Sequence, residues 1–125
     1  MGASASGHRH AVLLVEEDDD LRHAFVERAR NSGLDPITFS DGRDALDYLR
    51  RGPRPCLILL DPQMPGLDGL AFRREQLRHP TLADIPTAVV SRGGFPGEAD
   101  ARALGLTAFL HKPVDPVQLL PLFAD

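Results

Sequence analysis

Two short runs of the chain are continuously apolar, and a helical pattern follows the first of them. The runs are Ala11–Val15 and residues 56–60. Each has the length of a strand, and apolar residues on both faces indicate strands that are covered on both sides. Acids come directly after the first run, and Leu21, Phe25 and Ala29 then recur at four-residue intervals. The chain is therefore expected to open with a strand, an acidic loop and an amphipathic helix.

The rest of the chain continues this alternation. Further strands are expected at residues 34–39, 87–90 and Ala108–His111, and further helices from Asp41 to Gly52 and at residues 69–78, 98–104 and 117–123. Pro36 interrupts the second strand, which places that strand at an edge of the sheet. Strands that alternate with helices pair in parallel through right-handed crossovers. The fold class is therefore α/β, a doubly wound parallel sheet of five strands with helices on both faces.

The ends of the first helix carry recognisable signals. Asp18 or Asp19 can cap its N-terminus, where a carboxylate also meets the positive end of the helix dipole. Gly33 follows the last apolar position and is a suitable C-terminal stop. The sequence leaves the choice between the two aspartates open.

Length and composition agree with one packed domain. The chain has 125 residues, of which 42% are hydrophobic and 26% are charged, as is usual for a folded domain of this size. Residues 1–10 are small, polar and without pattern, so we expect a flexible leader there and the domain at residues 11–125.

Charge and cysteine content exclude several classes of function. The formal net charge is −4, with 14 Lys and Arg against 18 Asp and Glu, so nucleic-acid binding by this chain alone is not expected. The single cysteine excludes an internal disulfide framework and fits a reducing compartment. The apolar runs are too short to span a membrane. A cytoplasmic protein is expected.

Polar side chains follow four of the predicted strands: Glu16 and Glu17, Asp61, Ser91, and Lys112. Ligands of such sheets bind outside the carboxyl ends of the strands. Clustered carboxylates need a neutralising partner, for which a hard cation such as Mg²⁺ is suited. This set supports phosphoryl transfer to a carboxylate, with Asp61 as nucleophile and Ser91 as hydrogen-bond donor. The simpler alternative is that the acids form only a solvated, helix-capping loop.

Four motifs occur in a familiar order: LLVEEDDDLR at 13–22, LILLDPQMPGLDGL at 57–70, VVS at 89–91 and FLHKP at 109–113. Together they resemble the receiver domain of bacterial two-component response regulators, over residues 11–123. The resemblance implies a flavodoxin-like sheet with strand order 2-1-3-4-5. It also implies that Asp61 accepts a phosphoryl group from a histidine kinase or a histidine phosphotransfer protein, with slow self-catalysed phosphorylation and dephosphorylation rather than enzymatic turnover.

The same resemblance implies the roles of the other site residues. Glu16, Glu17, Asp61 and the backbone carbonyl of Gln63 would hold Mg²⁺ or Mn²⁺. The remaining positions are the switch hydroxyl Ser91, the switch aromatic Phe109, the phosphate-binding Lys112, and Pro113, which follows a cis peptide bond.

Some positions depart from the family pattern. Glu17 stands where the family has Asp, and its extra methylene is expected to weaken Mg²⁺ binding and to slow phosphorylation. Arg92 replaces a small residue and is a candidate modulator, which either covers the phosphoryl group or pairs with the acids and so slows hydrolysis. The glycines and proline of 93–97, together with Pro121, deplete the usual dimerisation face, so a monomer or weak dimer is expected.

These features bear on three functions. The first is a phospho-accepting receiver that acts on an unknown downstream protein. The alternative is a pseudo-receiver, which binds proteins without using phosphate, and it is favoured by Glu17 and Arg92. A phosphatase or phosphotransferase fits poorly, because Gln63 stands where such enzymes carry an acid two residues after the nucleophile.

Overall fold

Five parallel strands form one sheet in the order β2-β1-β3-β4-β5. The computed structural model describes residues 9–63, 67–93 and 102–123. The strands are β1 (Ala11–Val15), β2 (Asp35–Phe39), β3 (Leu57–Leu60), β4 (Thr87–Ser91) and β5 (Ala108–His111). The parallel sheet, its strand order and the edge position of β2 confirm the expected fold class.

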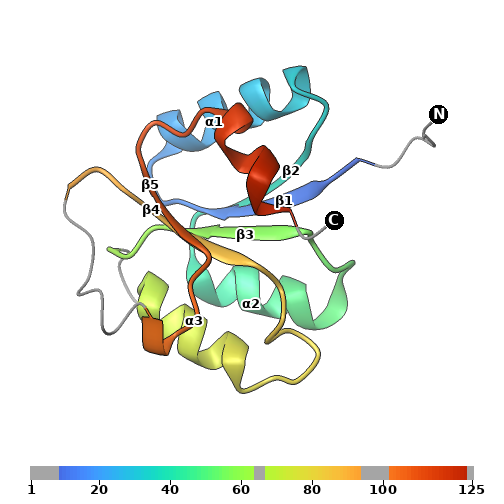
Figure 1. The fold of residues 1–125 in the computed structure, drawn as a ribbon, viewed down its shortest axis with the longest axis vertical. Helices are drawn as coiled ribbons and strands as arrows, with labels where there is room; N and C mark the ends of the chain where they lie inside the picture. The colour runs from blue at the N-terminus through green and yellow to red at the C-terminus, as the bar shows by residue number, and fades with distance from the viewer. Residues whose placement is uncertain (1–8, 64–66, 94–101, 124–125) are drawn as a thin grey trace.

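Helices cover both faces of the sheet (Figure 1). They are α1 (Asp19–Asn31), α2 (Gly42–Arg51), α3 (Gly69–Leu77) and the 3₁₀ helix η1 (Pro116–Leu122). One face carries α1 and η1, and the other carries α2 and α3. The expected helix at 98–104 lies mostly outside the described residues, as do most of the expected leader and of the 93–97 stretch.

The central strands supply two separate cores from alternate residues. Val12 and Leu14 of β1 pack toward α1, whereas Leu13 and Val15 pack toward α2 and α3. Because β1 is buried on both sides, it shows no apolar and polar alternation in sequence. The strand β3 divides its side chains between the two cores in the same way.

Aspartates start the helices α1, α2 and α3. The side chain of Asp18 accepts from the backbone N–H of Leu21 and caps α1, while Asp41 caps α2 and Asp68 caps α3. The structure thus selects Asp18 over Asp19. Gly33 follows α1 with φ of 82°, a conformation that glycine adopts without steric penalty.

The C-terminal helix is a 3₁₀ helix rather than an α-helix. Asp115 and Gln118 form a capping box at its start, and Pro121 lies inside it. A proline cannot donate the backbone hydrogen bond of an α-helix and its ring clashes with the preceding turn. The disruption expected from Pro121 is therefore observed. The segment forms a 3₁₀ helix, which is wound more tightly than an α-helix and has hydrogen bonds that span fewer residues.

A buried polar network joins α3 to the segment before β5. Arg73 is 5% exposed and donates to the carbonyls of Leu104 and Gly105 and to Oγ1 of Thr87. The Thr87 hydroxyl donates in turn to Gln76 of α3. Burial lowers the pKa of Arg73. The carbonyl and hydroxyl acceptors replace the hydrogen bonds to water that its N–H groups lose on burial.

Candidate functional site

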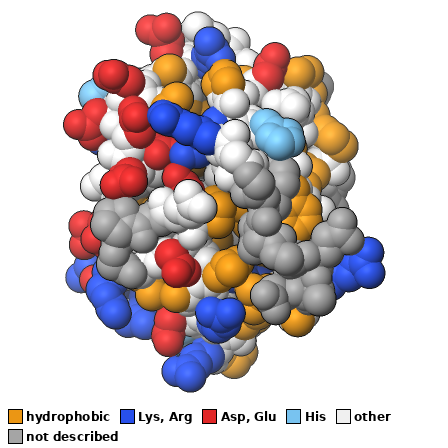
Figure 2. Space-filling view, turned by 90° about the vertical axis from the view of Figure 1, so that its left-hand side faces the viewer, with side chains coloured by type: hydrophobic (Ala, Val, Ile, Leu, Met, Phe, Trp, Pro, Cys, Tyr) orange, Lys and Arg blue, Asp and Glu red, His pale blue; other side chains and the backbone are white. Residues whose placement is uncertain are grey.

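The carboxyl ends of the strands bring the expected polar residues to one edge of the sheet. Glu16 directly follows β1, Asp61 follows β3, Ser91 ends β4 and Lys112 follows β5. Strand pairing aligns these ends, because β3 lies between β1 and β4 and β4 pairs with β5. In the space-filling view onto this edge, acidic side chains gather around a group of Lys and Arg side chains (Figure 2).

Lys112 links two buried carboxylates at the centre of this edge. Its ammonium donates to Oδ2 of Asp61 at 2.6 Å and forms an ion pair with Oε1 of Glu16. Asp61 is 8% exposed and Glu16 is 3% exposed. Burial alone would lower the pKa of Lys112, but the hydrogen bonds and charges of Asp61 and Glu16 outweigh it and raise that pKa. The ammonium therefore stays protonated at neutral pH and offsets one of the two negative charges of Asp61 and Glu16.

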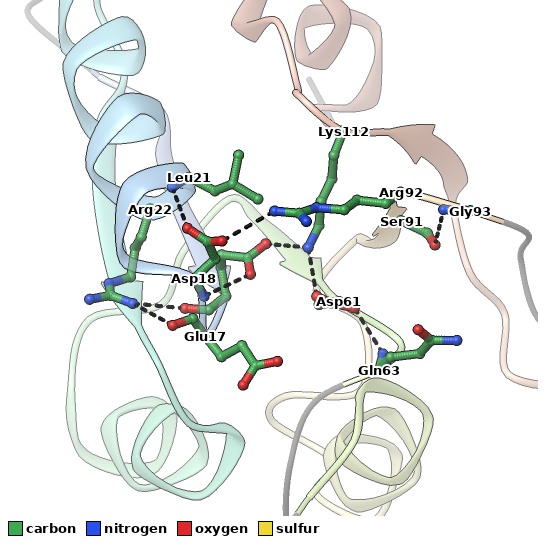
Figure 3. A network of polar contacts seen from close by, with 11 residues as sticks. Glu17, Asp18, Leu21, Arg22, Asp61, Gln63, Ser91, Arg92, Gly93 and Lys112 are labelled. Atoms are coloured by element: carbon green, nitrogen blue, oxygen red, sulfur yellow. Dashed lines mark hydrogen bonds and ion pairs between the residues drawn. The ribbon is translucent and has the colours of Figure 1, made fainter.

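The carboxylate of Asp61 is also fixed from its own loop. Its Oδ1 accepts from the backbone N–H of Gln63 at 2.8 Å (Figure 3). Gly69, at the start of α3, packs directly against the backbone of this loop, since a Cβ there would come within 2.9 Å of Cα of Pro62. The helix α3 thus supports the strand end that carries Asp61.

The acidic loop after β1 is held by its own hydrogen bonds and by Arg22. The backbone N–H of Asp18 donates to Oε2 of Glu16 at 3.0 Å. The Arg22 guanidinium donates to the carbonyls of Glu16 and Glu17 and to the carboxylate of Asp19. Sequence reasoning missed Arg22, whose only signal was its position one turn after the acids. This arginine fixes the loop backbone.

The expected metal ligands lie around one cleft but are not grouped as a closed metal cage. Glu16, Glu17, Asp61 and Gln63 all line it. Glu17 is exposed, and Lys112 engages the carboxylates of Glu16 and Asp61. Across residues 9–63, 67–93 and 102–123, no three His, Cys, Asp or Glu side chains are close enough to hold a metal ion by themselves.

The two expected switch residues have different surroundings. Ser91 is buried, lines the cleft and accepts from the backbone N–H of Gly93 at 3.3 Å. Phe109 lies on β5, is 37% exposed and stands outside the cleft lining. The Lys112–Pro113 peptide bond is cis. The structure thus brings Ser91, but not Phe109, to the side of Asp61.

Arg92 crosses from the end of β4 to the start of α1. Its Nη2 lies 3.1 Å from Oδ2 of Asp18, so the arginine pairs with the acidic loop, one of the two arrangements expected for it. The backbone N–H of Leu21 is the main cause that lowers the pKa of Asp18, and the charge of Arg92 adds to the lowering. In Figure 3 the Arg92 side chain runs past Lys112 and Asp61 toward Asp18.

The cleft formed by these residues is polar and open to solvent on one side. Its volume is about 330 Å³, and it is lined by Glu16, Glu17, Asp18, Asp61, Gln63, Ser91, Arg92, Gly93 and Lys112. A carboxylate, a hydroxyl and two cations in one cleft form a set that can receive a small, doubly charged oxyanion. In the described part of the chain, no helix is long and apolar enough to cross a membrane.

Comparisons with known proteins agree with this geometry. The family model for the response regulator receiver domain matches residues 12–123. The cyclic di-GMP phosphodiesterase response regulator RpfG of Xanthomonas campestris pv. campestris is 39% identical over 100 residues, which are 79% of this chain and 26% of that protein. The chain spans only part of the length of such curated relatives, for example 22% of the C4-dicarboxylate transport regulator DctD of Pseudomonas aeruginosa and 52% of the nodulation protein W of Bradyrhizobium diazoefficiens.

Solved structures show the same architecture. The chemotaxis protein CheY4 of Vibrio cholerae superimposes with a TM-score of 0.81 and 25% identity, covering 91% of this chain and 95% of that one. The Mn²⁺-bound form of the response regulator Rcp1 gives a TM-score of 0.79 and 25% identity, covering 93% and 96% of the two chains. The five-stranded sheet and its helices are thus those of receiver structures.

Proposed function

Since this chain belongs to the response regulator receiver family, we propose that it is a phospho-accepting switch of a two-component phosphorelay in the cytoplasm. Asp61 takes the phosphoryl group from a phosphohistidine of a histidine kinase or a histidine phosphotransfer protein. The observation that carries this proposal is the position of Asp61, a nearly buried carboxylate at a strand end that Lys112 and the Gln63 N–H hold within a polar cleft.

The residues of the cleft fit the steps of this transfer. An oxygen of Asp61 forms a bond to phosphorus as the bond from phosphorus to the donor histidine nitrogen breaks, and the bonding electrons stay on that nitrogen. Each carboxylate oxygen has two acceptor sites, so the contacts with Lys112 and Gln63 leave room for attack. Lys112 neutralises the incoming phosphoryl oxygens, and the Ser91 hydroxyl donates a hydrogen bond to one of them.

We also propose that a divalent cation assists, as Mg²⁺ or Mn²⁺. The carboxylates of Asp61, Glu16 and Glu17 and the carbonyl of Gln63 are hard oxygen donors around one cleft, which fits such an ion. Mg²⁺ commonly takes only one or two carboxylates and completes its shell with water and phosphate oxygens, so a full protein cage is not required. When bound, the cation would neutralise charge on the phosphoryl group.

A specific observation favours the second candidate, a pseudo-receiver that binds partners without phosphorylation. Glu17 is exposed, and the Arg92 guanidinium bridges to Asp18 at the cleft. With Glu17 in the loop, the cation site would be weaker, and Arg92 would occupy part of the opening of the cleft. Both effects would slow phosphorylation. In either case the output is a change in contacts with a downstream protein, and the receiver acts as a signalling module rather than as an enzyme with turnover.

Treatment with acetyl phosphate and Mg²⁺, followed by intact-mass measurement, separates these functions. A phospho-accepting receiver gains about 80 Da, the mass of one phosphoryl group, and Asp61→Asn does not. The Asn variant keeps the shape of the side chain and removes only the nucleophilic charge. If the wild-type protein gains no adduct, the pseudo-receiver function is favoured. If it consumes many equivalents of acetyl phosphate, it is an enzyme.

A further inference from the structure

The ion pair between Arg92 and Asp18 joins two elements on opposite sides of the cleft. Arg92 directly follows Ser91 at the end of β4, and Asp18 caps α1. Both residues line the cleft that contains Asp61. Their side chains are 66% and 39% exposed, which places the pair at the rim of the cleft. In Figure 3 the Arg92 side chain crosses that of Lys112 and ends beside Asp18.

This ion pair can open without loss of local structure. The two oxygens of Asp18 have separate partners, since Oδ1 accepts from the N–H of Leu21 and Oδ2 contacts Arg92. The cap of α1 therefore does not depend on the arginine. Solvent-exposed ion pairs contribute little to stability, because water screens them and both side chains lose freedom. Arg92 is thus held where it is by a weak contact.

A phosphoryl group on Asp61 would compete strongly for Arg92. It carries close to two negative charges and three acceptor oxygens, against the single charge of the Asp18 carboxylate. The planar guanidinium presents paired donors that match phosphate oxygens. Lys112 already serves Glu16 and Asp61, and Arg92 is the other cation among the residues that line the cleft.

We propose that Arg92 moves from Asp18 to the phosphoryl oxygens when Asp61 is phosphorylated, and there shields the acyl phosphate from water. This inference rests on the proposed function. In hydrolysis a water oxygen bonds to phosphorus as the bond between phosphorus and the Asp61 oxygen breaks. The electrons of that bond return to the carboxylate, and the water proton leaves with inorganic phosphate. Water attacks opposite the leaving carboxylate, from the open side of the cleft, where Arg92 lies.

The lifetime of the acyl phosphate tests this shield. The full chain and its variants are phosphorylated with acetyl phosphate at saturating Mg²⁺, the donor is removed, and loss of the adduct is followed by intact mass. Arg92→Ala is expected to shorten the lifetime several-fold, and Arg92→Lys to restore part of it, since lysine keeps the charge without the paired donors. Asp18→Asn is expected to prolong it, because asparagine still caps α1 but releases Arg92.

The double variant and a control make the test specific. Asp18→Asn added to Arg92→Ala is expected to change nothing further, because the aspartate acts only through the arginine. Arg78→Ala removes another exposed arginine, which pairs with Glu75 of α3 outside the cleft and is 76% exposed against 66% for Arg92, and is expected to keep the wild-type lifetime. Equal lifetimes of wild type and Arg92→Ala would overturn the shield alone. A wild-type chain that takes no phosphoryl group would overturn both proposals.

Discussion

At the scale of single residues, the site depends on Lys112, whose ammonium contacts two carboxylates that are almost withdrawn from water. Removing charges from water is costly, and the attraction within the group compensates only while every charge has its partner. Lys112 is also the only lysine in the sequence, the other basic residues being arginines. Its titration can therefore be followed without overlap from other lysines.

We predict that the folded protein loses stability at alkaline pH through Lys112. The pKa of its ammonium is raised above the ordinary value of 10.5 by Asp61 and Glu16. The stabilisation is fully present below about pH 10.5 and is lost as the pH rises through the higher folded-state pKa. Lysine-selective NMR gives this pKa, and urea unfolding at a series of pH values gives the stability.

Lys112→Met supplies the reference for that experiment. It leaves two carboxylates unneutralised and is expected to be less stable at pH 7 by about 2–3 kcal/mol, below the ~3–5 of a fully buried pair. It should also lack the loss of stability that the wild type shows as the pH rises above about 10.5. A wild-type lysine that titrates at or below 10.5 would contradict the charge balance described for the site.

Gly69 is the second residue with a sharp expectation. A methyl group at this position would collide with the backbone of Asp61 and Pro62, and neither backbone can move without displacing the strand end. Gly69→Ala is therefore expected to lower the free energy of unfolding by about 1–3 kcal/mol and to slow phosphorylation. Gly93→Ala is the matched control, since its new Cβ would meet nothing within 4 Å. Equal stability of the two variants would show that α3 does not support Asp61.

At the scale of elements, the start of the first helix could be predicted from its aspartates, whereas the bridges between elements could not. Aspartates before each apolar pattern predict helix starts, because the first backbone N–H groups need acceptors. Arg73 would be assigned to the solvated face of α3 on charge alone. Two of its acceptors lie 31 and 32 residues further along the chain, and no local sequence pattern indicates such a contact.

The capping role of Asp41 leads to a prediction for α2. Its carboxylate accepts from the backbone N–H of Arg43 at 2.6 Å and of Asp44 at 3.3 Å. Asp41→Ala removes the Oδ1 acceptor that both N–H groups share and is expected to lower the free energy of unfolding by about 1 kcal/mol. Asp41→Asn keeps a capping oxygen and should lose only a small part of this. Urea unfolding of the wild type and the two variants measures these changes in the free energy of unfolding. If both variants lose the same amount of stability, the effect comes from the charge of Asp41 and not from capping.

At the scale of the whole molecule, the doubly wound sheet explains why residues far apart in the sequence can be predicted to lie at one edge. Parallel strands end at one edge, so residues that follow each apolar run must meet there. Asp61, Ser91 and Lys112 were predicted in this way and lie together. The contact of Arg92 with Asp18 depends instead on where a long exposed side chain comes to rest, which the sheet topology does not determine.

Binding of Mg²⁺ should be visible in the stability of the whole domain. A ligand that binds only the folded state adds about 2.7 kcal/mol at 100 times its dissociation constant, which raises the melting temperature by several degrees. We predict such a rise for the wild type, a larger one for Glu17→Asp at the same subsaturating Mg²⁺, and a smaller one for Asp61→Asn. If Glu17→Asp gives no gain, the longer side chain does not weaken the cation site.

The phosphoacceptor itself can be identified by reductive trapping. Borohydride reduces an aspartyl phosphate to the alcohol, which leaves homoserine in place of the aspartate, and peptide mass spectrometry locates it. After treatment with acetyl phosphate and Mg²⁺, we predict homoserine at position 61 and at no other aspartate. A reduced residue at Asp18 or another acid, or a phosphorylated protein that shows no reduced residue at Asp61, would contradict the assignment of Asp61 as the residue that receives the signal.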